Sequence, residues 1–413
     1  MNIEQSYRKI FVNTSSQIIS KVITVILGFL MVGVLTRYLG VAQYGIYNLV
    51  FAYLASFGIF ADFGLQLSLV RDLSSVKAPE ELKSAYFALK IILTVLSIFL
   101  ALIFLLLFPY STMVKMAVII GSLAVGVGYL NGYGASVLQS KVKLDTVAVL
   151  EVINRIVTVC AIVVFVFLKL NIYAIISTIF IGNIVTLVIN IYLTPEYFRL
   201  KHFPSLPLLF TIIKSSFPVG ITALLSMLYF KIDTMMLSVM KTTTDVGIYS
   251  LSYKIFENII MLWLFYMASV YPLMSRAVKE KAQSQLNSFT KSSLIIAIMF
   301  SGITIGVSWF AAPLAIRILG GNNFLASITP FRILVLALPF VFINNIQYYL
   351  LLSMSKIPSI IIILVVALSF NFIVNLLIIP TYGYLGTSVS TVVTEVITLI
   401  GYAFALKKSK YLV

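Results

Sequence analysis

Long apolar stretches joined by short polar connections constrain this chain more than any other feature. A helix needs about 20 apolar residues to cross the roughly 30 Å hydrocarbon core of a bilayer. Segments of that kind lie at 12–36, 44–69, 84–108, 113–138, 146–168, 171–193, 211–240, 246–273, 290–315, 326–353, 357–379 and 384–406. The sequence therefore predicts an all-α polytopic membrane protein with twelve transmembrane helices.

The composition supports this fold class. Of the 413 residues, 61% are hydrophobic and only 10% are charged, whereas soluble domains are about one quarter charged. The formal net charge is +16, but the basic residues are dispersed between apolar spans. We interpret them as topology signals and expect membrane lipids, and no nucleic acid, as partners.

The lysines and arginines are distributed unevenly between the two sides of the predicted membrane. Eighteen lie in connections on the side of the two termini, and five lie on the opposite side. Under the positive-inside rule, both termini are cytoplasmic. A missed or extra span would invert every later connection and remove the bias, so the bias also supports the count of twelve.

Two kinds of site are excluded by residue counts. The chain has one cysteine, Cys160, and one histidine, His202, so we expect neither an intrachain disulfide nor a Cys/His metal centre, and no cofactor.

An Asp-Phe-Gly triplet at 62–64 is typical of kinases, but the His-Arg-Asp loop that a kinase also needs is missing. We expect this triplet to lie within a continuous second helix that runs on to Arg71.

Short matching segments recur in the same order in the two halves of the chain. YGIYNLVF (44–51) matches VGIYSLSY (246–253), and QSKVK (139–143) matches MSKIP (354–358). Six spans per half give both halves the same orientation, which predicts a parallel repeat around a central cavity with alternating access. We place the N-terminal bundle at 1–193, the cytoplasmic linker at 194–210 and the C-terminal bundle at 211–413.

Charged residues inside the spans are the candidate site residues, because each costs at least about 2.5 kcal/mol in hydrocarbon. Lys90 lies close to a helix end, which favours snorkelling to the interface; for Lys21 and Arg155 a cavity and snorkelling are balanced. Five residues lie deeper and are expected to face a cavity: Lys231, Asp233, Lys254, Glu257 and Glu395. Lys254 and Glu257 are spaced to form a pair.

Asp62 has a short side chain, and we expect it to face the bundle interior, paired with Lys21 or Lys90. It then either titrates during transport or holds the first helices together. Buried carboxylates can exchange protons in the working range. We therefore expect Glu257 and Glu395, with Asp233 and Asp62 as further candidates, to couple transport to an ion or proton gradient.

Three longer stretches resemble a known family. GFLMVGVLTRYLGVAQYGIYNLVFAYLASFGIFADFGLQLSLVRDLS is similar to the first two spans of bacterial polysaccharide flippases. FAAPLAIRILGGNNFLASITPFRILVLALPFVFINNI and NFIVNLLIIPTYGYLGTSVSTVVTEV are similar to later spans of the same family. These flippases transport O-antigen and capsule repeat units, and belong to the multidrug/oligosaccharidyl-lipid/polysaccharide exporter superfamily.

The resemblance implies a flippase, not an enzyme, in the bacterial cytoplasmic membrane. Its substrate would be an undecaprenyl-diphosphate-linked oligosaccharide, moved from the cytoplasmic to the outer leaflet. A polysaccharide polymerase and chain-length proteins would be its protein partners. The headgroup-binding role would fall on Arg155, Lys231 and Lys254, with Lys21 and Lys90 near the cytoplasmic mouth.

A multidrug/cation antiporter of the same superfamily is the alternative function. Drug exporters often carry an acidic ion site in the first span, where this chain has Lys21 and no acid. Peptidoglycan lipid flippases usually have fourteen spans, which also favours the oligosaccharide branch. A non-transporting scaffold would not need so many buried charges.

Overall fold

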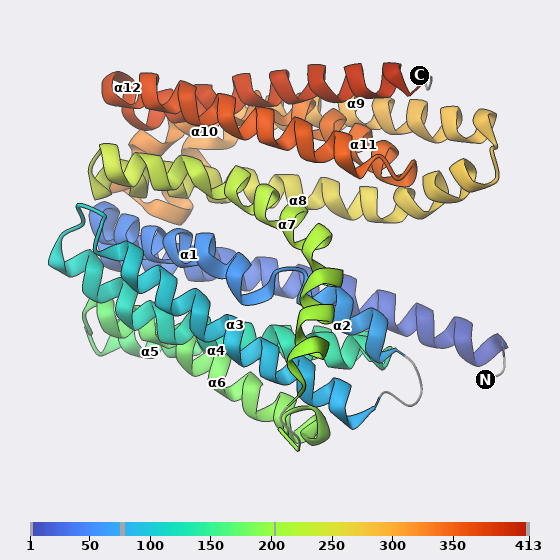
Figure 1. Cartoon of the computed structure of the whole chain (residues 1–413). Coiled ribbons are helices and arrows are strands. Elements are labelled where there is room, and N and C mark those ends of the chain that lie inside the picture. The colour runs from blue at the N-terminus through green and yellow to red at the C-terminus, as the bar shows by residue number, and fades with distance from the viewer. Residues whose placement is uncertain (1–2, 75–78, 202–203, 410–413) are drawn as a thin grey trace. The chain divides into compact units, whose positions relative to one another are not determined.

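The computed structural model describes residues 3–74, 79–201 and 204–409, and these residues form helices and short connections without any strand (Figure 1). The helices are α1 (Ile3–Asp62), α2 (Leu65–Leu73), α3 (Glu80–Leu105), α4 (Thr112–Ser140), α5 (Leu144–Phe167), α6 (Ile172–Leu193), α7 (Leu206–Met240), α8 (Thr243–Lys279), α9 (Gln283–Gly320), α10 (Ile328–Val335), α11 (Leu338–Ser353) and α12 (Ile357–Lys408). Two 3-10 turns, η1 (Pro195–Tyr197) and η2 (Asn322–Ser327), lie between them.

Ten of the predicted spans coincide with one helix or one arm of a broken helix, whereas 44–69 runs from α1 into α2 and 326–353 is divided between α10 and α11. Within the described residues, eight helical segments are long and apolar enough to cross a membrane, and the pair α10–α11, bent by 46°, makes a ninth. α1 contains the predicted span 12–36 and most of 44–69, and α12 contains both 357–379 and 384–406. α1 is broken at Gly40 and α12 at Gly383, where φ is 67° and 52°, a conformation that glycine adopts without steric cost. The all-α polytopic fold class is confirmed.

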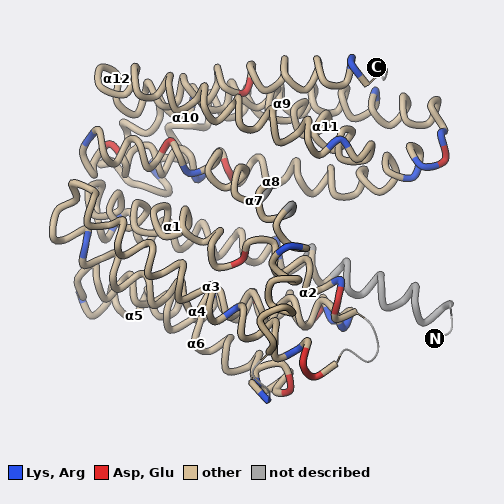
Figure 2. Tube along the Cα trace, in the orientation of Figure 1, with Lys and Arg blue, Asp and Glu red and all other residues tan. Residues whose placement is uncertain are grey.

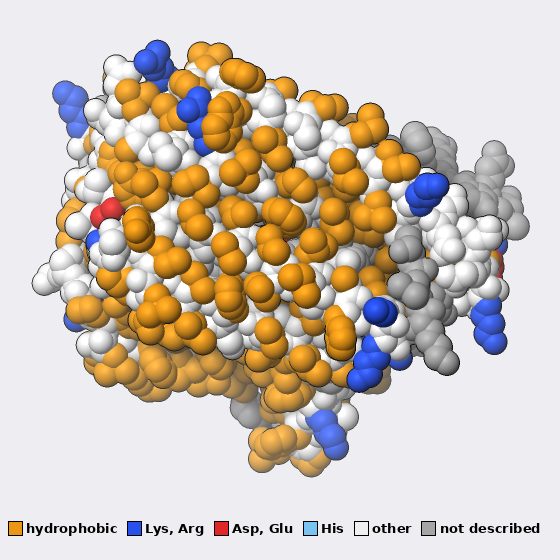
Figure 3. All heavy atoms as spheres, turned by 90° about the horizontal axis from the view of Figure 1, so that it is seen from above, with side chains coloured by type: hydrophobic (Ala, Val, Ile, Leu, Met, Phe, Trp, Pro, Cys, Tyr) orange, Lys and Arg blue, Asp and Glu red, His pale blue; other side chains and the backbone are white. Residues whose placement is uncertain are grey.

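The broad face in Figure 3 is covered by hydrophobic side chains, and the lysines and arginines on it lie toward its edges. Large apolar side chains on the helix surfaces are highly exposed, for example Phe310 at 85% and Phe404 at 71%. A water-soluble protein rarely exposes an apolar surface of this extent. The surface is therefore suited to contact with lipid.

The chain forms two compact units. Unit 1 comprises Met1–Leu39 and Leu49–Met227, and unit 2 comprises Gly40–Asn48 and Leu228–Val413. In unit 1, α6 packs against α4 and α5; in unit 2, α11 packs against α8, α9 and α12. The predicted linker at 194–210 separates the two halves of the internal repeat, whereas the two units are defined by compactness. The predicted division into bundles therefore stays a prediction.

The two glycines of the repeated Gly-Ile-Tyr motif meet inside unit 2. A Cβ atom added to Gly45 would overlap the carbonyl oxygen of Thr243 and lie 2.9 Å from the nitrogen of Gly247. A Cβ atom added to Gly247 would in turn overlap the carbonyl oxygen of Val41. Close backbone approach at glycines is typical of helix contacts in membrane proteins, so the repeated motif marks a helix crossing.

The predicted continuous helix through the Asp-Phe-Gly triplet is wrong. α1 ends at Asp62 and α2 begins at Leu65, because Phe63 and Gly64 adopt left-handed conformations with φ of 44° and 79°. Only glycine takes this conformation freely, so Gly64 permits the break. Gly220 of α7 packs against the backbone at this break, since a Cβ atom at Gly220 would lie 2.7 Å from the carbonyl oxygen of Phe63.

Candidate functional site

Asp233 of α7 is held by three neutral donors in the interior of unit 2. Its Oδ2 accepts hydrogen bonds from Tyr249 Oη at 3.0 Å and Thr391 Oγ1 at 2.8 Å, and its Oδ1 accepts one from Asn375 Nδ2 at 2.6 Å. The residue is 4% exposed. A carboxylate with several hydrogen-bond donors can keep its charge away from water.

Glu395 of α12 lies in the same interior. Its Oε1 accepts from Tyr229 Oη at 2.7 Å, and its Oε2 accepts from Asn344 Nδ2 at 2.7 Å. α11 carries Asn344, so the bent pair α10–α11 positions a donor for this carboxylate. Glu395 is 7% exposed.

Asparagine side chains link the surroundings of the two carboxylates. Asn375 Nδ2 also donates to Asn371 Oδ1 at 2.9 Å, and Asn371 Nδ2 donates to Thr394 Oγ1 at 3.3 Å. Asp233 and Glu395 line one small cavity of about 10 Å³, close to the room that a single water molecule needs. Among the described residues, the buried Oδ1 atoms of Asn375 and Asn344 have no hydrogen-bond partner. The arrangement offers carboxylate and amide oxygens to a proton or a small cation.

Lys231, Lys254 and Glu257 form an ion-pair triad in unit 2. Glu257 Oε2 lies 2.8 Å from Lys254 Nζ, as its spacing predicts, and Glu257 Oε1 lies 3.7 Å from Lys231 Nζ. The three side chains are 31–42% exposed. Both lysines therefore already have a counter-charge.

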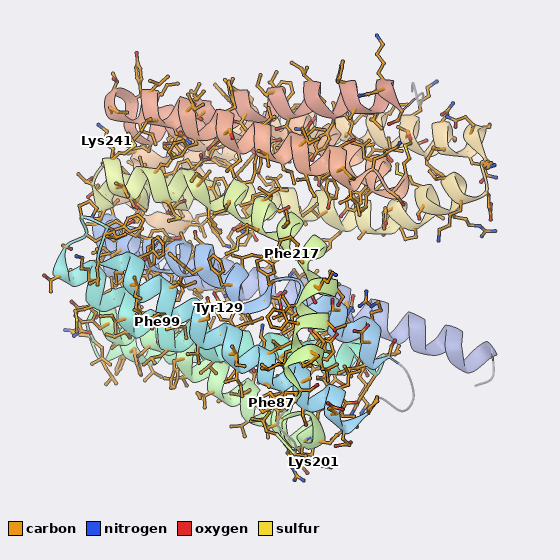
Figure 4. The ribbon with its side chains drawn as sticks, in the orientation of Figure 1. Phe87, Phe99, Tyr129, Lys201, Phe217 and Lys241 are labelled. Atoms are coloured by element: carbon orange, nitrogen blue, oxygen red, sulfur yellow. The ribbon has the colours of Figure 1, made fainter. Side chains whose placement is uncertain are left out.

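The predicted pairing of Asp62 is found with Lys90 and not with Lys21. Lys90 Nζ lies 3.5 Å from Asp62 Oδ1 and donates to the carbonyl oxygen of Ala61 at 2.9 Å. The ring of Tyr129, labelled within unit 1 in Figure 4, lies 5.8 Å from the same nitrogen. The prediction that Lys90 snorkels is wrong, since its side chain is only 1% exposed. The end of α1 at Asp62 explains this, because the last carbonyls of a helix have no intrahelical partner.

Lys21 and Arg155 line a separate polar pocket in unit 1. The pocket has a volume of about 420 Å³ and also contains Glu151 and the side chains of four asparagines. Arg155 of α5 lies against α1, with Nη1 3.5 Å from Met31 Sδ. Two of the predicted headgroup cations are thus brought to one pocket by the first and fifth spans.

The asparagines of this pocket form a hydrogen-bonded network between α4, α5 and α6. Asn131 and Asn154 each donate to Thr186 Oγ1, at 2.9 Å and 3.1 Å. Asn131 also donates to the carbonyl oxygen of Asn183, and Asn154 to its Oδ1, at 2.8 Å and 2.9 Å. Asn190 donates to Asn131 Oδ1 at 3.2 Å. The polar wall of the pocket is therefore fixed by its own hydrogen bonds.

An apolar groove lies between the two arms of α12 in unit 2. It has a volume of about 540 Å³ and is lined by aliphatic side chains such as Ile362 and Val366 together with Phe404. Lys356, directly before the start of α12, and Lys408, its last residue, also line the groove. An apolar groove with basic residues at the helix ends is suited to a lipid chain and its anionic headgroup.

Comparison with known proteins decides the family. The model of a family described as polysaccharide biosynthesis protein matches residues 10–278, which is more than half of the chain. The chain belongs to the polysaccharide biosynthesis protein family. A second family model, MatE, matches residues 218–377 of this polysaccharide biosynthesis protein. A search of curated proteins gives no match.

Solved structures share the fold of this polysaccharide biosynthesis protein. The lipid II flippase MurJ in an inward closed conformation is 18% identical with a TM-score of 0.77, over 94% of this chain and 87% of MurJ. An inward-facing multidrug resistance MATE transporter of the MOP superfamily is 15% identical with a TM-score of 0.74, over 97% of this chain and 99% of that chain. A MOP superfamily transporter from Pyrococcus furiosus, described as having a binding pocket of reverse polarity, is 14% identical with a TM-score of 0.68, over 97% of this chain and 95% of that chain. The chain therefore has the fold of a membrane flippase or transporter, and its family and fold neighbours are not enzymes.

In this polysaccharide biosynthesis protein, the predicted site residues fall into four separate groups. Two groups lie in unit 1, the pocket with Lys21 and Arg155 and the Lys90–Asp62 pair; two lie in unit 2, the Lys231–Glu257–Lys254 triad and the cluster of Asp233 and Glu395. The sequence analysis did not predict that asparagines line the pocket of Lys21 and Arg155. A signal was present, since Asn183, Thr186 and Asn190 recur on one helical face.

Proposed function

We propose that the protein is a flippase that moves an undecaprenyl-diphosphate-linked oligosaccharide from the cytoplasmic to the outer leaflet by alternating access. The observation that carries this proposal is the pocket of unit 1, in which Lys21 and Arg155 offer positive charge beside asparagine side chains. Guanidinium and ammonium groups bind phosphates well. The family and the fold shared with a lipid II flippase support a lipid-linked substrate.

The apolar groove of unit 2 supports the same substrate class. A polyprenyl chain needs an apolar surface, which the walls of the α12 groove provide. Its diphosphate needs cations, of which Lys356 and Lys408 line the groove and Lys21 and Arg155 line the polar pocket. The chain thus offers both kinds of surface that an amphipathic lipid-linked sugar requires.

We assign ion coupling to the cluster of Asp233 and Glu395. Both carboxylates are buried, line one small cavity and accept hydrogen bonds only from neutral side chains in the described structure. A proton or a small monovalent cation entering this cavity would neutralise one of the two carboxylates, which lowers the cost of burying the pair. Glu257 already has two lysine partners, so we give it a structural role.

The test is flipping of a fluorescent lipid-linked oligosaccharide in proteoliposomes, read as protection of the fluorophore from an impermeant quencher. Arg155→Gln should lower the rate by about tenfold, in line with the loss of one charged hydrogen bond, and wild-type protein should respond to an imposed proton or sodium gradient. Wild-type protein that leaves the lipid in its original leaflet would refute the proposal.

A multidrug/cation antiporter is the second candidate, supported by the MatE match over residues 218–377. In a deletion strain, raised drug sensitivity with unchanged surface glycan would favour it. Loss of glycan with lipid-linked repeat units retained on the cytoplasmic face would favour the flippase. In the cell we place the protein in the cytoplasmic membrane, with a polysaccharide polymerase and chain-length proteins as partners.

A further inference from the structure

The charges of the candidate cations are not equally available. Lys90 is paired with Asp62, and Lys231 and Lys254 share Glu257. In the described part of the chain, Lys21 and Arg155 have no carboxylate within ion-pair distance, although Glu151 lines the same pocket. Their pocket carries one more positive than negative charge, which is the same surplus as in the Lys231–Glu257–Lys254 triad. In the pocket, however, neither cation is held by a described carboxylate, so both are available to attract an anion.

The hydrogen-bonding groups of the pocket are unevenly satisfied. The amide nitrogens of Asn131 and Asn154 each donate two hydrogen bonds within the network. Asn190 is 2% exposed, and its Oδ1 has no partner among the described residues. A buried acceptor without a partner is unfavourable, but this oxygen lies against Gly134 of α4 and not against the pocket. Asn154, whose Oδ1 accepts no hydrogen bond from the described residues, is the amide left to accept one from a ligand.

Three glycines of α4 keep the space around the network. A Cβ atom at Gly134 would lie 2.6 Å from Asn190 Cγ, and one at Gly128 would lie 3.1 Å from Asn183 Nδ2. Gly132 itself lines the pocket. Larger residues at Gly134 or Gly128 would displace the asparagines, and one at Gly132 would meet Gln66 Nε2 at 2.7 Å. This stretch of α4 therefore shapes the pocket as well as the helix packing.

The geometry points to a subsite for a single anionic sugar in unit 1. Lys21 and Arg155 bind its negatively charged group, and the side-chain oxygen of Asn154 accepts a hydrogen bond from one of its hydroxyl or acetamido groups. The volume of about 420 Å³ lies at the lower end of small-molecule pockets and suits one sugar ring rather than a whole oligosaccharide. This inference rests on the proposed function and specifies which part of the substrate is recognised.

Two parts of a lipid-linked oligosaccharide have this chemistry. One is the sugar phosphate at the junction with the lipid, and the other is a carboxylate-bearing sugar within the glycan. Binding of N-acetylglucosamine 1-phosphate, glucuronate, glucose and inorganic phosphate to purified protein in lipid nanodiscs, measured by calorimetry, separates them. Tighter binding of the 1-phosphate assigns the junction, and tighter binding of glucuronate assigns an acidic sugar.

The variants test both halves of the subsite. Arg155→Gln should weaken all anionic probes at least tenfold, whereas Asn154→Ala should weaken the two anionic sugars about fivefold and leave inorganic phosphate unchanged. Ala135→Met, which fills the pocket from α4, gives a second test that does not touch the network. Asn345→Ala is the matched control, because Asn345 is half-buried in α11 and donates only to the carbonyl oxygen of Val341.

Three results would overturn the subsite: glucose binding as tightly as the anionic sugars, Asn154→Ala and Ala135→Met both binding like wild type, or no binding of either anionic sugar at millimolar concentration. The proposed function fails separately. If wild-type protein flips lipid-linked oligosaccharide but binds no anionic sugar, the subsite is wrong and the flippase stands. If it binds the sugars but flips nothing, the flippase is wrong and the subsite stands.

Discussion

At the scale of single residues, Asp233 depends on being an acceptor. Tyr249, Thr391 and Asn375 each donate one hydrogen bond to its carboxylate, and the carboxylate itself donates none. Asp233→Asn would turn one oxygen into a nitrogen that faces a donor, at a cost of about 1–3 kcal/mol. We expect a thermal midpoint several degrees lower in detergent and loss of the response of flipping to an ion gradient.

The matched control for Asp233→Asn is Glu280→Gln. Glu280 is half-exposed and pairs with Arg276 on the surface of unit 2, where an ion pair contributes about 0–1 kcal/mol. It should leave both the midpoint and the gradient response unchanged. An Asp233→Asn protein that behaves like this control would remove Asp233 from the coupling site.

The pair of Lys90 and Asp62 should show coupling in a double-mutant cycle. Lys90 is buried and Asp62 is 28% exposed, so Asp62→Asn leaves a buried ammonium without its counter-charge, held by the carbonyl of Ala61 and the ring of Tyr129. Lys90→Met keeps the volume and removes the charge. We expect the double variant to be more stable than the sum of the single effects by about 1 kcal/mol, measured by thermal unfolding. Additive effects would show that the two charges do not interact.

At the scale of helices, the crossing at Gly45 and Gly247 tolerates no side chain. Gly45→Ala or Gly247→Ala would push a methyl group into a backbone carbonyl of the other helix, and overpacking of this kind costs about 1–3 kcal/mol or more. We expect a large fall in the yield of folded protein, measured by size-exclusion chromatography in detergent.

Two glycines of α9 provide the comparison for this crossing. Gly302 and Gly306 are exposed, and a Cβ atom at either would meet nothing within 4 Å. Gly302→Ala and Gly306→Ala should leave the yield unchanged or raise it, because alanine is the better helix former by about 1 kcal/mol. Equal yields for all four variants would mean that the Gly45–Gly247 contact does not limit folding.

At the scale of the whole molecule, the sequence was informative about the features that depend on local composition. Apolar length predicts each span, because the requirement for about 20 residues is set by the bilayer. It did not predict the break at Phe63 and Gly64, since the surrounding residues are as apolar as those of an unbroken helix. Hydropathy does not register a change of backbone conformation.

The candidate site was predictable only in part, for a different reason. Individual charges inside spans can be read from the chain, but their partners lie on other helices. Lys231 meets Glu257 of the next helix, and Asn131 meets Asn190 from two helices further on. Which cations remain unpaired is therefore a property of the packed units, and the sequence could not separate Lys21 and Arg155 from Lys231.

Charge asymmetry supplies the last prediction, the orientation of the chain in the membrane. Lysines and arginines gather toward one end of each unit in Figure 2, in line with the bias of eighteen to five between the two sets of connections. In a Cys160→Ala background, Ser284→Cys lies at the basic end, in the first turn of α9, and Asn322→Cys lies at the opposite end, in η2 after α9. Because basic connections stay in the cytoplasm, an impermeant maleimide should label Asn322→Cys in intact spheroplasts. Ser284→Cys should react only after permeabilisation. The reverse pattern would place both termini outside the cytoplasm, and it would require the substrate to move in the opposite direction from the one we propose.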